Sequence, residues 1–133
     1  MPAAVDPSSR ALQQVEQIGI CDGRGQWQAV AALLDTGNEH LTCVDEQYAI
    51  GVGLWDPTGR SVTSSQTSTT TLRGIVPGAE ATDVPVIHVK LRVGGVVFGP
   101  MRVALTQLES SRPVLLGMDV LEEMFSSGFH ISR

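Results

Sequence analysis

Short apolar stretches alternate with turn residues along most of this chain, a pattern typical of an all-β protein. Two pairs of stretches are joined by turn sequences, Asp22–Gly25 and Gly94–Gly95, and each pair predicts a hairpin. Pro77–Gly78 predicts a third turn. We expect strands at residues 15–21, 26–34, 41–44, 72–75, 82–93, 96–105 and 114–116.

Helical patterns are short. Asp119 begins an amphipathic segment that ends before Gly128, which predicts one short C-terminal helix with an acidic first turn. Asp45 is expected to cap a helical turn over residues 47–49. Residues 1–12 are expected to form a flexible lead-in to one domain, residues 13–133. Of the fourteen residues 58–71, ten are Ser or Thr, which indicates a solvent-facing loop before an edge strand.

Composition narrows the class of function. A net charge of −5 and a pI near 5.0 argue against a nucleic-acid partner or an anionic membrane surface. No apolar run approaches membrane-spanning length, so we expect a cytoplasmic protein or a domain of a longer one. The histidines His40, His88 and His130 lack paired metal-ligand spacing, so we expect neither a metal nor another cofactor. Cys43 is expected to be a small buried hydrophobe rather than a nucleophile.

The candidate chemistry begins where the apolar run 29–34 ends in Asp35, Thr36 and Gly37. A carboxylate at the end of a buried strand needs hydrogen-bond donors or a partner that shares its proton. The triplet alone is equally typical of an ordinary turn after a strand. Residues 114–119 repeat the plan of three apolar residues followed by a glycine-containing turn, so the chain has two halves of similar design.

Taken together, these segments resemble the retropepsins, the retroviral-type aspartic proteases, and their cellular or retrotransposon relatives. The resemblance rests on Asp35-Thr36-Gly37, on the hairpin around residues 74–81 and on Leu115-Leu116-Gly117 followed by a helix. It covers roughly residues 15–131. It implies a closed β-barrel subunit with one short C-terminal helix and a flap hairpin.

The resemblance also implies a mechanism. Each retropepsin chain supplies one Asp-Thr-Gly, and this sequence contains one, so the resemblance implies a homodimer that hydrolyses an extended peptide or protein substrate between two Asp35 carboxylates. Thr36 would hold the two active-site loops together and Gly37 would let the substrate backbone approach. The implied flap consists of Gly74, Ile75, Val76, Pro77 and Gly78. The implied groove includes Val114 and Leu115.

Three positions depart from the family pattern. Asn38 stands where retropepsins usually carry Ala or Ser, beside the catalytic carboxylate. Met118 and Glu39 stand where the retroviral enzymes have an Arg and Asp ion pair, which predicts lower dimer affinity. These departures keep open the alternative of a catalytically weak or inactive retropepsin-fold module for dimerisation or peptide binding.

Overall fold

The computed structural model describes residues 10–35, 41–57, 68–72, 82–108 and 111–131, which form nine strands and two helices. Two helices accompany the strands, α1 (Glu46–Gly51) and α2 (Met118–Ser126). The strands are β1 (Arg10–Leu12), β2 (Val15–Cys21), β3 (Trp27–Leu34), β4 (Cys43–Asp45), β5 (Ser68–Leu72), β6 (Thr82–Val93), β7 (Val96–Thr106), β8 (Val114–Leu116) and β9 (Phe129–Ile131).

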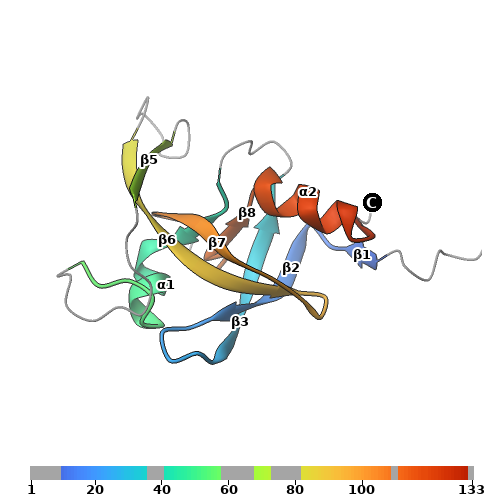
Figure 1. Cartoon of the computed structure of the whole chain (residues 1–133), viewed down its shortest axis with the longest axis horizontal. Coiled ribbons are helices and arrows are strands. Elements are labelled where there is room, and N and C mark those ends of the chain that lie inside the picture. Colours follow the sequence, from blue (N-terminus) through green and yellow to red (C-terminus); the bar gives the residue numbers. More distant parts are fainter. Residues whose placement is uncertain (1–9, 36–40, 58–67, 73–81, 109–110, 132–133) are drawn as a thin grey trace, which may run out of the picture.

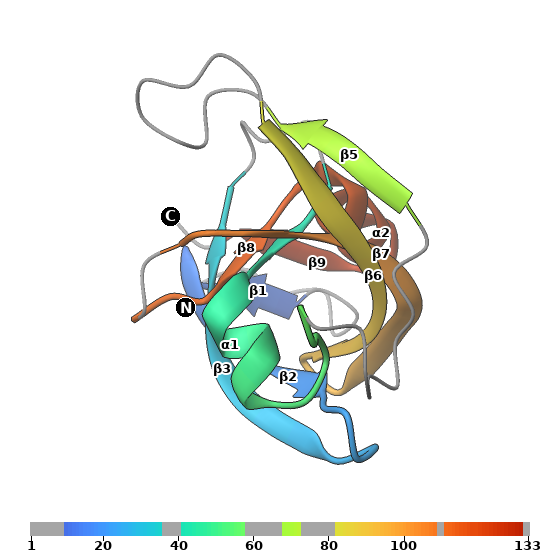
Figure 2. The same ribbon diagram turned by 90° about the vertical axis from the view of Figure 1, so that its left-hand side faces the viewer.

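Six of these strands close into a barrel in the order β2-β3-β8-β4-β7-β6. The barrel closes because β2 also pairs with β6, at Gly19↔Arg92 and Ile20↔Leu91. β5 extends the sheet beyond β6 as its edge strand, and the antiparallel ladder between them reaches Leu72↔Thr82. Figures 1 and 2 show β5 beside the first part of β6 at the end of the molecule away from α2, while the rest of β6 crosses the molecule to pair with β2.

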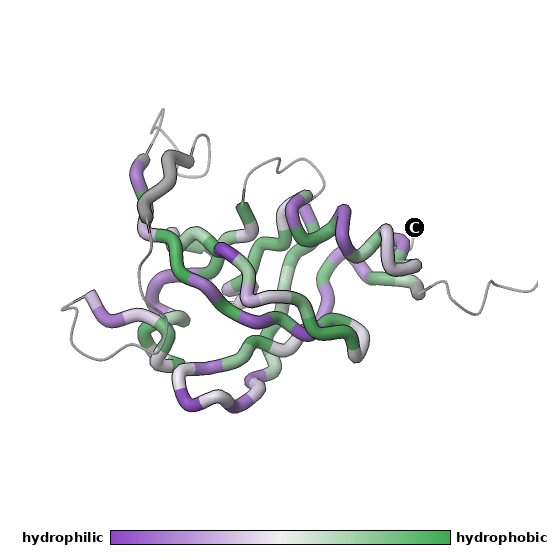
Figure 3. Tube along the Cα trace, in the orientation of Figure 1, coloured by the Kyte–Doolittle hydropathy of each residue, from purple (hydrophilic) through white to green (hydrophobic). Residues whose placement is uncertain are grey.

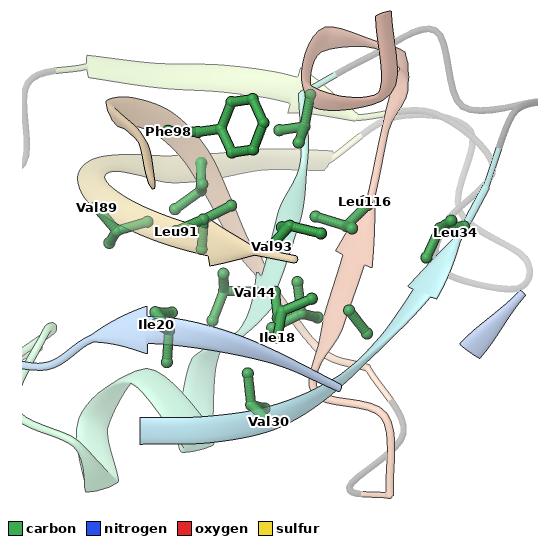
Figure 4. Close-up of a cluster of buried hydrophobic side chains, with 14 of the residues drawn as sticks. Ile18, Ile20, Val30, Leu34, Val44, Val89, Leu91, Val93, Phe98 and Leu116 are labelled. Carbon is green, nitrogen blue, oxygen red and sulfur yellow. The ribbon is translucent and has the colours of Figure 1, made fainter. Parts of the chain in front are cut away.

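Alternating side chains fill the barrel. In β3, Val30, Ala32 and Leu34 are buried while the residues between them are partly exposed. The same alternation on neighbouring strands brings the labelled side chains of Figure 4 together between the strands. In Figure 3 hydrophobic segments run along the barrel strands, interrupted by polar ones, and the turn between β2 and β3 is polar. Burial of these apolar surfaces is the main driving force for the fold.

α2 and a small second sheet lie at the other end of the molecule (Figure 1). α2 buries Val120, Leu121 and Met124 against the barrel core. The chain then turns at Gly128, whose φ of 94° is readily adopted only by glycine, into β9. β9 pairs in parallel with β1, so both ends of the described chain lie together.

Most of the expected elements are confirmed, with small differences. The helix after Asp45 and the C-terminal helix are present, and the Asp45 side chain accepts a hydrogen bond from Tyr48 N at 3.1 Å, as a cap should. β5 (Ser68–Leu72) begins within the stretch where a loop was expected and pairs along β6, whereas residues 73–75 of the strand expected at 72–75 lie outside the described residues. Residues 1–9 of the expected lead-in lie outside the described residues, whereas Arg10–Leu12 form β1.

The Asp22 carboxylate organises the turn between β2 and β3. It accepts hydrogen bonds from Arg24 N at 2.8 Å, Gln26 N at 2.9 Å and the Gln28 amide at 2.8 Å. The adjacent Gly23 N donates to Val52 O at 2.9 Å, which fastens the turn to the end of α1. Donors favour the ionised form, so the Gln28 amide and then the Gln26 N–H lower the pKa of Asp22 below 3.8.

The turn predicts a pH dependence of stability. Because the folded-state pKa of Asp22 lies below its unfolded value, its contribution to stability is complete well above pH 3.8 and is lost as the pH falls through the folded-state pKa. The melting temperature of wild type should therefore exceed that of Asp22→Asn at pH 6, and the difference should shrink at pH 3. Gln28→Ala, which removes the largest cause, should weaken this pH dependence. An equal difference at both pH values would contradict the assignment.

Candidate active site

The Asp35 backbone is fixed where β3 meets β8. These strands are parallel neighbours in the register Leu33↔Leu115 and Leu34↔Leu116, and Asp35 N donates to Leu116 O at 3.0 Å. The two similar sequence segments therefore lie side by side at the same edge of the barrel. An acidic side chain is held at the end of a core strand by backbone pairing with the other half of the chain.

The Asp35 side chain shares a sheet face with a row of residues that point away from the barrel interior. Side chains two positions apart on an extended chain point to the same face, so Asp35 lies on the face of Leu33 rather than of buried Leu34. The strand registers continue this row from Leu33 to Leu115, Cys43 and Ala104. Cys43 and Ala104 are fully buried, and Leu115 packs against them. This second, smaller cluster gives the face beside Asp35 a rigid floor.

Burial accounts for the chemistry of Cys43. Loss of solvent, followed by the negative charges of Asp119 and Asp35, raises the pKa of its thiol to about 12. Because the nucleophilic form is the thiolate, Cys43 is inert at ordinary pH, and the expectation of a buried hydrophobe is confirmed. The same electrostatic contributions place Cys43 close to both carboxylates.

The segment that follows the active-site triplet is anchored by Thr42 and Asp119. The fully buried Thr42 donates to the Asp119 carboxylate from its backbone N at 3.1 Å and from its hydroxyl at 2.8 Å. Its hydroxyl oxygen in turn accepts from Gly117 N at 3.1 Å. Asp35 N and Thr42, which flank residues 36–41, therefore bond to the consecutive residues Leu116 and Gly117.

A pocket of about 180 Å³ lies on the Asp35 face. Its lining consists of Leu33 from β3, Leu108 and Arg112 from the segment between β7 and β8, and Val114 and Leu115 from β8. Asp45 anchors two residues between β7 and β8. Its carboxylate accepts from Leu108 N at 2.8 Å, and its backbone N donates to Pro113 O at 2.7 Å. The pocket is thus built on hydrogen-bonded backbone at two points.

A larger hollow, of about 510 Å³, lies beside the Asp22–Gly25 turn at the opposite end of β3. Its carboxylate, Asp22, already accepts three hydrogen bonds from its own turn and strand, which satisfy its acceptors without a ligand. We therefore place the candidate active site at the smaller pocket beside Asp35.

The predicted site residues divide into described and undescribed positions. Val114 and Leu115 line the pocket, and Asp35 follows Leu34, which pairs with Leu116 next to them on β8. The active-site loop residues Thr36, Gly37 and Asn38 and the flap residues Gly74–Gly78 lie outside the described residues, and their roles stay predictions.

Sequence reasoning missed several residues that shape the site. Thr42 is a polar residue inside the apolar run 41–44, and that exception was an available signal. Leu33 follows from alternation with Asp35. Leu108 and Arg112 carry no local signal, because only the tertiary fold brings them to the pocket.

The residues that the structure describes lack two features. Within those ranges, no group of three or more His, Cys, Asp or Glu is placed to hold a metal ion. No helix in the same part of the chain is long and apolar enough to cross a membrane.

Solved structures that are similar to this chain include the following three proteins. EIAV protease, complexed with the inhibitor HBY-793, matches 92% of this chain and 95% of its own length, with 16% identity and a TM-score of 0.59. A Legionella pneumophila protein with unknown function matches 96% and 94%, with 16% identity and a TM-score of 0.52. A retropepsin-like aspartic protease from Rickettsia conorii matches 81% and 80%, with 20% identity and a TM-score of 0.45. No family model and no curated protein matches the sequence.

Proposed function

The chain has a retropepsin-like fold, and on that basis we propose that it is an aspartic endopeptidase, active as a homodimer. The observation that carries the proposal is the position of Asp35: its backbone is held by Leu116 at the junction of the two halves of the chain, beside an apolar pocket. The sequence contains one Asp-Thr-Gly, so a second copy of the chain must supply the second carboxylate.

Two carboxylates about 3 Å apart cannot both ionise, so the pair shares one proton. The ionised Asp35 accepts a proton from a water molecule, which attacks the peptide carbonyl. The protonated Asp35 of the second copy donates to the carbonyl oxygen. Collapse of the resulting tetrahedral intermediate breaks the C–N bond as the amine is protonated, without a covalent enzyme intermediate.

The remaining site residues would bind and position the substrate. In this proposal Thr36 holds the two active-site loops together, Gly37 and Asn38 lie beside the substrate backbone, and residues 74–78 close over an extended peptide. Val114 and Leu115, consecutive residues of β8, line the groove. EIAV protease, of similar fold, is a protease that binds an inhibitor, which supports this assignment.

The test is cleavage of a mixed peptide library from about pH 3.5 to 7, with the mass in solution measured under the same conditions. Cleavage by a species of dimer mass supports the proposal. A folded dimer that binds extended peptides without cutting them would instead support a binding module, and Asn38→Ala would then test whether the amide suppresses activity. A monomer that neither binds nor cuts would overturn both assignments.

A further inference from the structure

Arg112 places a positive charge at an apolar pocket. Its side chain is exposed, and it lines the pocket together with Leu33, Leu108 and Leu115. No ion pair or side-chain hydrogen bond joins Arg112 to another residue in the part of the chain that the structure describes. The guanidinium is exposed at the pocket and carries five donors suited to a carboxylate.

The pocket lies next to the candidate catalytic carboxylate. Leu33 of β3 is two residues before Asp35, which directly follows this strand, and Leu115 on β8 is the direct neighbour of Leu33. A side chain that occupies the pocket therefore belongs to a substrate residue beside the scissile bond. A volume of about 180 Å³ accommodates a side chain of medium size.

We propose that this pocket selects a glutamate side chain next to the scissile bond, with its methylene groups on the leucines and its carboxylate paired with Arg112. The inference rests on the proposed protease function and adds a substrate class to it. The dimer axis would repeat the pocket, so the preference applies on either side of the cleaved bond.

The negative charge of the site makes Arg112 necessary for the selection of a glutamate side chain. A catalytic pair that shares one proton retains one negative charge, and the chain as a whole carries −5. An acidic substrate side chain would be repelled without a local cation. The Asp45 backbone N donates to the carbonyl oxygen of Pro113, the residue after Arg112, and the Asp45 carboxylate accepts from Leu108 N. The guanidinium is therefore presented from a backbone that is anchored directly beside it.

The test uses pairs of peptides that differ only in Glu or Gln beside the cleaved bond. Near pH 6 wild type should cleave the Glu peptide roughly fivefold more efficiently in kcat/KM, the size of one partly exposed ion pair. The ratio should fall toward one below about pH 4.3, where the substrate carboxyl is protonated. Arg112→Gln should abolish the preference, and Arg112→Glu should favour a Lys peptide instead.

Arg24→Gln provides the matched control, because it removes the same charge from the turn at the opposite end of β3. It should leave the Glu to Gln ratio unchanged. Equal ratios in wild type and Arg112→Gln would overturn the inference while leaving the protease function in place.

A binding measurement separates this inference from the proposed function. Asp35→Asn should bind fluorescent Glu peptides more tightly than Gln peptides, by the same factor. Glu-selective binding that depends on Arg112, in a protein whose wild type cuts nothing, would support the pocket and overturn the protease. Absence of both binding and cleavage would overturn both.

Discussion

Asp35→Asn should reduce peptide cleavage by at least about a thousandfold while leaving the fold intact. An amide neither accepts a proton from water nor donates one as a carboxylic acid does, so both chemical roles of the residue are lost. The fold should survive because Asp35 contributes to the barrel through its backbone, whose N–H donates to Leu116 O at 3.0 Å and is retained in the variant.

Mixing the two proteins distinguishes a shared active site from one that a single chain completes. If two Asp35 residues are required, chains that exchange freely in an equal mixture form about a quarter wild-type dimers, so activity per wild-type chain should fall by about half. A chain that acts alone would keep its activity per wild-type molecule unchanged. Unfolding curves that coincide for Asp35→Asn and wild type provide the control for folding.

Asp119→Ala should destabilise the protein by about 2–4 kcal/mol, the second large effect we expect. The substitution leaves the backbone N and hydroxyl of fully buried Thr42 without their acceptor. Chemical denaturation should show the loss as a lower midpoint with an unchanged slope.

Two further variants separate the hydrogen bonds of Asp119 from its charge and from its place on the helix. Asp119→Asn keeps an oxygen acceptor and should cost about 1 kcal/mol or less. Glu122→Ala removes an exposed acid from the same helix and should change stability by less than about 0.5 kcal/mol. Equal losses for Asp119→Ala and Glu122→Ala would refute the anchoring role.

The hydrogen bonds between Thr42 and Asp119 link the same parts of the chain as the Arg and Asp ion pair of the retroviral enzymes. Retroviral relatives are expected to tie the active-site segment to the helix through an Arg and an Asp, whereas Met118 and Glu39 occupy those positions here. Asp119 and Thr42 make a link between the same two parts of the chain with a carboxylate and a hydroxyl. Asp119→Ala should therefore lower cleavage as well as stability.

Local patterns predicted the framework well. Alternation in β2 and β3, the Asp22–Gly25 turn and the amphipathic α2 are properties of neighbouring residues, and each was found where its sequence placed it. The closed barrel was implied by the resemblance to the retropepsins. The repeated apolar segments that became β3 and β8 indicated two halves of similar design, but not their parallel pairing.

Long-range partners were beyond those patterns. Thr42 and Asp119 are 77 residues apart, and Asp45 and Leu108 are 63 apart, so no local spacing relates them. Asp45 is an instructive case, because its predicted role as a helix cap is confirmed but its second oxygen serves the pocket segment. β1 was missed because three residues, Arg10-Ala11-Leu12, carry too little periodicity to mark a strand.

The pairing of β1 with β9 has a consequence for the order of folding. It joins the two ends of the described chain through only three residues on each strand, so it closes the longest loop with one of the shortest ladders. Such a contact forms after the barrel and opens before it. In hydrogen exchange, amides of β1 should exchange faster than those of the long β6 and β7 pair, and a second copy that packs on this sheet should slow them selectively.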